Sequence, residues 1–121
     1  GIADSIPINK IMSMRYDKVI VILTRPENYK KKKTNTLLPK IYYRRDPRLI
    51  SAINNRYRVY NRQLEQVNAL ARERKIFVIR PSRLVNIKRI ERNTDKIQEM
   101  YDLGREDAAK NLAAMAEYLN S

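Results

Sequence analysis

Two adjacent side chains near the start of the sequence, Asp4 and Ser5 in GIADSIPINK, are the first whose types could do hydrolytic chemistry. A serine nucleophile needs a base that meets it side chain to side chain, and a turn such as G-x-S-x-G that presents it to an oxyanion hole. Neighbouring residues do not meet in this way, and the G-x-S-x-G motif is absent. We therefore predict that Asp4 or Ser5 caps a helix.

The sequence contains neither His nor Cys. This excludes Ser-His and Cys-His catalytic pairs, disulfides, and the usual zinc, copper and non-haem iron sites. No cofactor and no metal are expected, and the chain by itself is not expected to be an enzyme.

Charge is distributed unevenly along the 121 residues, which carry a net charge of +13. Residues 1–92 hold 23 Lys and Arg against 7 acids, whereas residues 93–121 hold 3 against 6. A basic surface of this kind attracts nucleic acid or anionic lipid, or docks on an acidic neighbouring domain. Charge alone does not choose among these partners.

A lysine run formed by Lys30, Lys31, Lys32 and Lys33 is the most basic stretch. Three interpretations stay open for it. It is a solvated loop, or it contacts an anionic membrane surface, where each Lys contributes about 1 kcal/mol. The third is nucleic-acid binding, in which Tyr29, Tyr42 and Tyr43 would stack on bases.

Arg25 and Arg80 each follow a predicted strand. Ligands of open parallel sheets bind beyond the carboxyl ends of the strands, so two neighbouring guanidinium groups there would clamp a phosphate or a carboxylate. The alternative is that each arginine pairs with a local acid such as Asp46 or Glu91.

The predicted elements alternate between strands and helices. Pro7–Met14 has the spacing of a short helix, and Lys18–Thr24 reads as a strand buried on both faces. Residues 27–46 form a basic loop with one short turn near 37–42. Asp46 caps a long helix that begins at Pro47, and its apolar stripe is expected to leave the arginines on the surface. The stripe comprises Leu49, Ile53, Tyr57, Tyr60, Leu64, Val67 and Ala71, and the arginines are Arg48, Arg58, Arg62 and Arg72.

A second buried strand is predicted at Lys75–Arg80, parallel to the first and joined to it by a right-handed crossover. Asn93 or Thr94 caps a further helix, which Gly104 is expected to end in the left-handed conformation. A last helix over Arg105–Leu119 should turn Ala108, Leu112, Met115 and Leu119 inward, and Tyr101 should be a core residue. The expected fold is α/β: a small βαβ unit with two parallel strands, a long crossover helix and C-terminal helices.

Several long segments, in this order, carry a resemblance: GIADSIPI, DKVIVILTRPENYKKK, DPRLISAINNRYRVYNRQLEQVNAL and IFVIRPS. Together they resemble the C-terminal part of bacterial patatin-like phospholipases, along almost the whole chain. In that family a Ser in a G-x-S-x-G turn pairs with an Asp in a D-G-[GA] motif. The resemblance makes Gly1 the last glycine of the second motif, and it implies that the catalytic Ser and Asp both lie before residue 1.

The resemblance implies a fragment of a larger three-layer α/β lipid acyl hydrolase or esterase. Because no apolar run has the length of a membrane span and the start lacks a signal peptide, we expect a cytoplasmic protein that is peripheral at the membrane. Residues 1–26 would finish the catalytic fold, 27–46 would connect, and 47–121 would form an appended region. Expected partners are the N-terminal catalytic region, an anionic lipid surface and, because a cut sheet exposes an edge, a second copy of the chain. The competing hypothesis is a free-standing basic module that binds nucleic acid.

Overall fold

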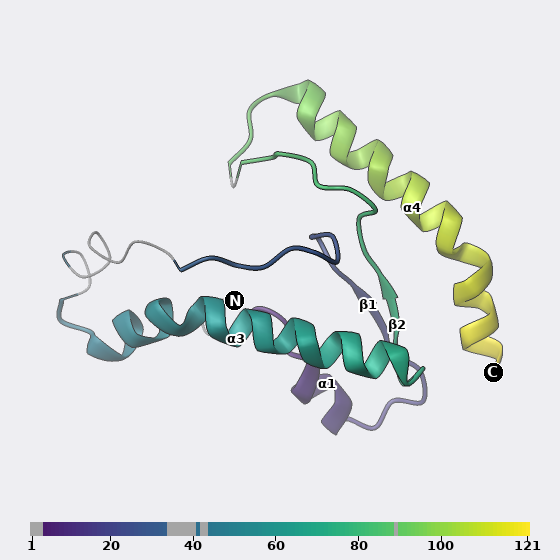
Figure 1. The fold of residues 1–121 in the computed structure, drawn as a ribbon, viewed down its shortest axis with the longest axis horizontal. Coiled ribbons are helices and arrows are strands. Elements are labelled where there is room, and N and C mark those ends of the chain that lie inside the picture. The colour runs from purple at the N-terminus through teal and green to yellow at the C-terminus, as the bar shows by residue number, and fades with distance from the viewer. Residues whose placement is uncertain (1–3, 34–40, 42–43, 89) are drawn as a thin grey trace. The chain divides into compact units, whose positions relative to one another are not determined.

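The computed structural model describes residues 4–33, 41, 44–88 and 90–121. Gly1 and most of the turn predicted near 37–42 lie outside the described residues. The elements, in chain order, are α1 (Ile8–Ser13), β1 (Ile20–Ile22), α3 (Pro47–Arg72), β2 (Phe77–Ile79) and α4 (Thr94–Asn120), as Figure 1 shows.

The predicted fold class is confirmed. β1 and β2 pair in parallel, with Ile20 beside Phe77, Val21 beside Val78 and Ile22 beside Ile79. The long helix α3 lies between them in sequence, and the long helix α4 follows. The chain divides into two compact units: residues 1–17 with 30–72 (unit 1), and residues 18–29 with 73–121 (unit 2).

Unit 1 is built on α3, whose start follows the predicted capping chemistry. The Leu49 N–H donates to Asp46 Oδ1 at 3.0 Å, so this carboxylate satisfies one of the free amides of the first turn. Four arginines lie off the apolar stripe and are exposed, as predicted: Arg48, Arg58, Arg62 and Arg72. α1 packs against α3, with Ile8 buried in α1 and Val67 buried in α3.

A buried glutamine of α3 holds the segment that precedes α1. Gln63 Oε1 accepts the Ile6 N–H at 3.2 Å, and Gln63 Nε2 donates to the Asp4 carboxylate. The N-cap of α1 is Pro7, which makes no side-chain capping hydrogen bond. The prediction that Asp4 or Ser5 caps this helix is therefore wrong, because Pro7 occupies the cap position and the Asp4 carboxylate is engaged by Gln63.

Unit 2 consists of the parallel sheet and α4. The predicted cap of α4 is confirmed: Asn93 Oδ1 accepts from the N–H groups of Asp95 and Lys96 at 2.9 and 3.3 Å. Just before it, the Glu91 carboxylate accepts the N–H groups of Asn93, Lys88 and Arg92. Backbone donors, chiefly that of Asn93, hold the pKa of Glu91 below its usual value.

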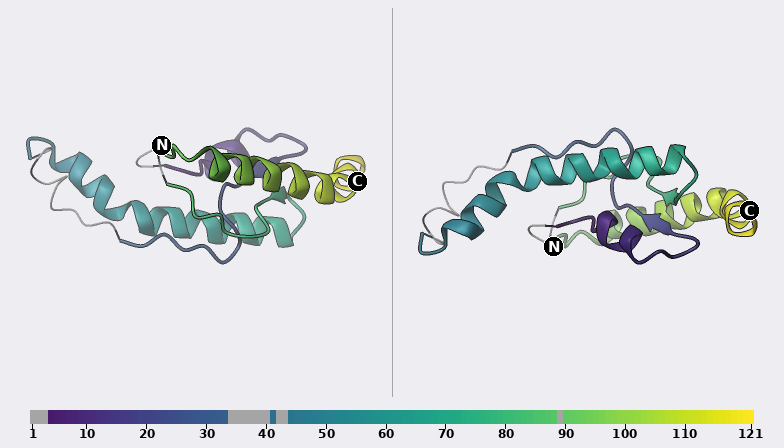
Figure 2. Two further views of the ribbon diagram at one scale, coloured as in Figure 1. Left: turned by 90° about the horizontal axis from the view of Figure 1, so that it is seen from above. Right: turned by 90° about the horizontal axis from the view of Figure 1, so that it is seen from below.

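α4 is one uninterrupted helix from Thr94 to Asn120, and Figure 2 shows it continuous in both further views. The predicted break at Gly104 is wrong, because the helix continues through this residue. Its φ is not positive, so it does not adopt the left-handed conformation. A helix interior tolerates a glycine at a cost of about 1 kcal/mol relative to Ala, which the rest of a 27-residue helix outweighs.

The face that α4 turns inward also differs from the prediction. Leu103 and Asp107 are buried, and Asn111 and Tyr118 on the same face are half-buried. Of the residues predicted inward, Met115 alone is half-buried, whereas Ala108, Leu112 and Leu119 are exposed, as is Tyr101. The buried face is offset by one residue from the predicted stripe because Asp107 and Asn111, both polar, occupy it.

The sheet is covered less completely than the unbroken apolar run of Lys18–Thr24 predicts. Val19 and Leu23 are buried, but Ile22 on the opposite face of β1 is 73% exposed. α4 packs against β2, with the rings of Tyr118 and Phe77 5.8 Å apart, and leaves the corresponding side of β1 open. Full burial of β1 is therefore wrong for this chain.

The hydroxyl of Tyr118 joins the C-terminal end of α4 to both strands. It accepts the Val19 N–H and donates to the Lys75 carbonyl, each at 3.1 Å. Lys18 Nζ lies 4.9 Å from the centre of the Tyr118 ring and donates to the Ser121 carbonyl at 2.8 Å. None of the helices in the described part of the chain has the length and apolar character needed to cross a membrane.

We predict that Tyr118→Phe lowers the free energy of unfolding by about 1–2 kcal/mol, because the Val19 N–H and the Lys75 carbonyl lose a shared partner. Urea unfolding followed by circular dichroism measures this change. Tyr101→Phe is the matched control, since its side chain is exposed, and it should change stability by less than about 0.5 kcal/mol. Equal effects of the two variants would show that the Tyr118 hydroxyl does not hold the sheet.

Candidate functional site

The carboxyl ends of β1 and β2 lie at the same edge of the sheet in unit 2. The two candidate arginines come shortly after these strands in the sequence. Ile22 and Ile79 are paired at this end, and the Leu23 N–H donates to the Ile79 carbonyl at 2.8 Å. Arg80 comes directly after β2, and Arg25 comes three residues after β1. The parallel register that the prediction required is therefore present.

Each arginine already has contacts within unit 2. Arg80 Nη1 lies 3.9 Å from Glu27 Oε1, and the Arg25 guanidinium lies 5.1 Å from the centre of the Tyr29 ring. The local acid beside Arg80 is thus Glu27, whereas Asp46 caps α3 and Glu91 binds backbone amides. Clamping of an anion by Arg25 and Arg80 together stays a prediction.

Beside these strand ends, unit 2 has an open groove of about 270 Å³ whose surface is almost entirely apolar. Its walls come from the ends of both strands and from one side of α4. The lining residues are Ile22, Leu23, Thr24, Ile79, Arg80, Pro81, Met100, Leu103, Gly104, Asp107 and Ala108. We call this the strand-end groove.

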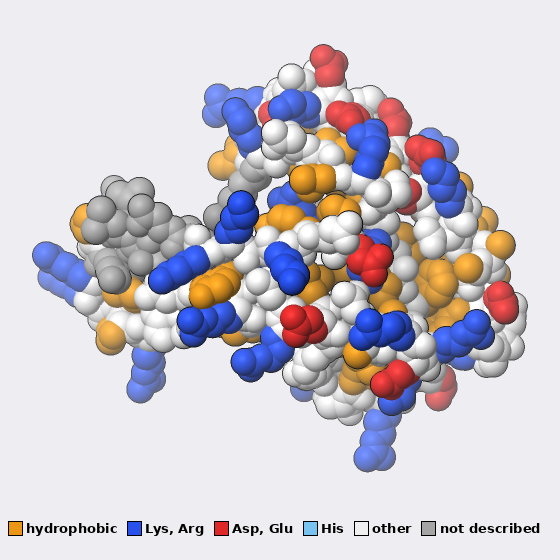
Figure 3. Space-filling model, viewed as in Figure 1, with side chains coloured by type: hydrophobic (Ala, Val, Ile, Leu, Met, Phe, Trp, Pro, Cys, Tyr) orange, Lys and Arg blue, Asp and Glu red, His pale blue; other side chains and the backbone are white. Residues whose placement is uncertain are grey.

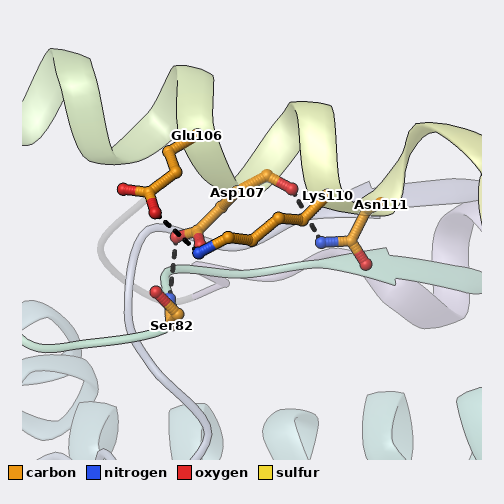
Figure 4. A network of polar contacts seen from close by, with 5 residues as sticks. All are labelled: Ser82, Glu106, Asp107, Lys110 and Asn111. Carbon is orange, nitrogen blue, oxygen red and sulfur yellow. Dashed lines mark hydrogen bonds and ion pairs between the residues drawn. The ribbon is translucent and has the colours of Figure 1, made fainter.

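Asp107 in the groove wall is only 4% exposed and has a defined partner. Its Oδ2 accepts the Ser82 N–H at 2.8 Å, and its backbone carbonyl accepts from Asn111 Nδ2 at 2.8 Å, as Figure 4 shows. Beside it, Lys110 donates to Glu106 at 2.6 Å, and that hydrogen bond raises the pKa of Lys110. Asp107 therefore ties the loop after β2 to α4.

Sequence reasoning did not single out Asp107. The available signal was an aspartate in the interior of a long helix, where it is a poor helix former, four residues before Asn111. An aspartate inside a helix is stabilised when its side chain has a hydrogen-bond partner elsewhere in the fold, and here that partner is the Ser82 amide.

The lysine run belongs to unit 1 and is fixed alongside α3. The Lys31 N–H donates to Asn61 Oδ1 at 2.9 Å, and Asn61 Nδ2 donates to the Lys31 carbonyl at 3.1 Å. Lys31 Nζ lies 5.0 Å from the centre of the Tyr60 ring. The side chains of Lys30, Lys32 and Lys33 are exposed. We call this segment, residues 30–33, the clamped lysine segment.

Basic side chains predominate on α3, and acidic side chains predominate on α4. Figure 3 shows Lys and Arg side chains over α3 and acidic side chains gathered over the first half of α4. Among the described residues, no group of three or more acidic side chains could hold a metal ion.

The chain belongs to the family described as Domain of unknown function (DUF6363), which matches residues 46–120. That range covers α3, β2 and α4 completely, and thus more than half of the chain. Comparison with curated proteins and with solved structures found no match.

We predict that Asp107→Ala destabilises the protein by about 2 kcal/mol, because the Ser82 amide loses a charged acceptor. Asp107→Asn keeps an oxygen acceptor and should cost about half as much. Thermal and urea unfolding of both variants test this. Glu117→Ala, an exposed acid on the same helix, is the control and should be nearly neutral. A neutral Asp107→Ala would contradict the structural role assigned to the carboxylate.

Proposed function

We propose that this chain is the C-terminal part of a patatin-like lipid acyl hydrolase and contributes structure and contact with a lipid surface rather than catalysis. The observation that carries the proposal is the resemblance of four segments, in their order and spacing, to the end of that family's sequences. On this proposal the catalytic Ser and Asp precede Gly1, the N-terminal catalytic region is the main partner, and the enzyme is cytoplasmic and peripheral at the membrane.

The state of Asp4 and Ser5 supports a non-catalytic role for this part. Gln63 Nε2 donates to the Asp4 carboxylate while Gln63 Oε1 accepts the Ile6 N–H, so the carboxylate has a structural partner on α3. The sequence contains no His or Cys, so it supplies no imidazole or thiol that could act as the base for a serine nucleophile. Chemistry would have to come from another part of a longer polypeptide.

The geometry of the clamped lysine segment supports contact with an anionic lipid surface. Its backbone is held by Asn61, so three exposed lysines project from a fixed support. Three lysines near an anionic bilayer contribute about 3 kcal/mol in total. That is enough to bias an enzyme toward its substrate surface without anchoring it.

The aromatic contacts favour this function over the competing nucleic-acid module. Stacking on bases needs free ring faces. Lys31 lies over the Tyr60 ring, and Arg25 lies over the Tyr29 ring. Each of these tyrosines near the lysine run therefore already has a cationic side chain of this protein on one face of its ring. Tyr42 and Tyr43, also considered for stacking, lie outside the described residues.

The first test concerns activity. We expect residues 1–121 to hydrolyse neither short-chain p-nitrophenyl esters nor phospholipid vesicles above a buffer control. A longer polypeptide, in which a G-x-S-x-G turn and an Asp-Gly pair precede Gly1, should hydrolyse them. Turnover by residues 1–121 that is abolished by Ser5→Ala would place the nucleophile in this chain and contradict the proposal.

The second test concerns the lipid surface. We expect the chain to bind vesicles containing anionic lipid more tightly than neutral vesicles, and more weakly as salt screens the exposed charges. Replacing Lys30, Lys32 and Lys33 with Gln should weaken this binding by a few kcal/mol at most. Lys31 is retained in this variant because it contacts Tyr60. Vesicle co-sedimentation measures the affinity.

A matched control removes the same charge elsewhere, by Lys10→Gln, Lys75→Gln and Lys88→Gln, all at exposed positions. It should bind vesicles better than the segment variant. Equal loss in the two triple variants would mean that net charge, and not the clamped lysine segment, attracts the membrane. Tighter binding to a single-stranded oligonucleotide than to anionic vesicles would favour the competing module.

A further inference from the structure

The positive charge of this chain is concentrated in unit 1. Residues 1–17 and 30–72 contain 14 Lys and Arg against 4 Asp and Glu, whereas residues 18–29 and 73–121 contain 12 against 9. In unit 2 several cations have a carboxylate partner, as in the ion pairs of Glu73, Glu99 and Glu106. Unit 1 has too few acids to pair its cations in this way, so an anionic partner is expected on unit 1.

Four exposed cations of unit 1 lie around Asn61. Three are the exposed lysines of the clamped lysine segment, and none of them has an ion-pair partner among the described residues. The fourth is Arg58, three residues before Asn61 and therefore its neighbour on the surface of α3. The acid beside this group is Glu65, four residues after Asn61. The group thus has a clear excess of positive charge.

The guanidinium group of Arg58 is held in place by Tyr57. Arg58 Nε donates to the Tyr57 hydroxyl at 2.9 Å, and the guanidinium lies 5.6 Å from the centre of the Tyr57 ring. Tyr57 is four residues before Asn61, so it lies on the side of α3 that holds the lysine segment. The Nη groups of Arg58 donate to no described residue, which leaves them available to an anion.

A phosphomonoester is the anion that matches these donors best. At neutral pH it carries a charge of about −1.5 to −2 and three strong acceptor oxygens, more than the single charge of a phosphodiester. A guanidinium group binds phosphate through two parallel N–H···O bonds, and lysine ammonium groups add charge-assisted hydrogen bonds. Because Asn61 already fixes the backbone of the lysine segment, binding has less conformational freedom to remove.

We propose that the clamped lysine segment and Arg58 bind phosphomonoester headgroups of a lipid surface, in preference to phosphodiester headgroups of the same total charge. This inference rests on the proposed contact with a lipid surface and names the class of headgroup. A lipid fits this site better than a soluble phosphate does. The cations are exposed and spread over two segments, and a surface presents several headgroups to them at once.

The test uses the 121-residue chain and two kinds of phosphatidylcholine vesicle. One contains about 10% phosphatidic acid, a phosphomonoester, and the other about 20% phosphatidylglycerol, a phosphodiester, so that both have the same surface charge at about pH 7.5. Co-sedimentation should show binding to the phosphatidic acid vesicles that is at least about fivefold tighter.

A change of pH tests the same preference without altering the protein. The phosphomonoester loses its second charge at about pH 6. The chain contains no His or Cys, so no side chain of ordinary pKa titrates between about pH 5.5 and about pH 7.5. We expect the preference for phosphatidic acid to be lost as the pH falls through this interval, while binding to phosphatidylglycerol vesicles stays constant.

Variants of Arg58 test its part in the site. Arg58→Gln should reduce the preference to less than about twofold, and Arg58→Lys, which keeps the charge but not the planar pair of donors, should restore only part of it. Arg72→Gln is the matched control, because it removes one charge from an exposed position of α3 about 21 Å along the helix from Arg58. It should leave the preference unchanged.

The possible failures are distinguishable. If the chain binds neither kind of vesicle, the proposed lipid-surface function is wrong, and the headgroup assignment falls with it. Equal binding to the two kinds of vesicle, or a preference that Arg58→Gln leaves intact, overturns the headgroup assignment alone. Displacement of the chain from phosphatidic acid vesicles by millimolar glycerol 3-phosphate would overturn the lipid as the source and assign the site to a free phosphate.

Discussion

The contact on which unit 2 depends is the hydroxyl of Tyr118, placed between the starts of the two strands. A sheet of two three-residue strands is too small to be stable alone, and parallel strands have no hairpin to hold them together. One phenolic oxygen accepts from Val19 and donates to Lys75, so the end of α4 fixes the spacing at which β1 and β2 begin. The register itself is carried by backbone hydrogen bonds, in which the Phe77 N–H donates to the Val19 carbonyl and the Leu23 N–H donates to the Ile79 carbonyl.

A second polar contact fixes the opposite end of the same sheet. Asp107 lies eleven residues before Tyr118, about 16 Å along the helix, and holds the backbone just beyond the carboxyl end of β2. α4 is therefore attached at both ends of the sheet by hydrogen bonds and in between by apolar packing such as that of Leu103. This places one side of the helix over β2 and leaves other apolar residues of the helix uncovered. Gly104 and Ala108 therefore line an open groove, and Leu112 is exposed.

The sequence predicts local chemistry well in this protein and tertiary polar contacts poorly. The caps at Asp46 and Asn93, the strand order and the arginine-bearing side of α3 follow from short-range rules, and the structure confirms them. The inward face of α4 could not be predicted because hydrophobicity assigns Asp107 to the surface, and its partner, the Ser82 amide, lies 25 residues away. The sequence predicts more burial of β1 than the structure shows, for a related reason. An apolar run indicates that a strand can be covered on both faces, but it does not show whether other residues of the same chain cover it.

The pair of hydrogen bonds between Asn61 and Lys31 has a consequence for the charge that the segment carries. The Asn61 amide hydrogen-bonds to the N–H and the carbonyl of Lys31 and makes no hydrogen bond to the lysine side chain. A neighbouring β-strand would bind the backbone in the same way. Residues 30, 32 and 33 can therefore exchange lysine for other residues while the path of the chain is retained. The charge of this surface and the path of its backbone are thereby independent of each other, because the helix that supports the segment does so through the backbone contacts of Asn61.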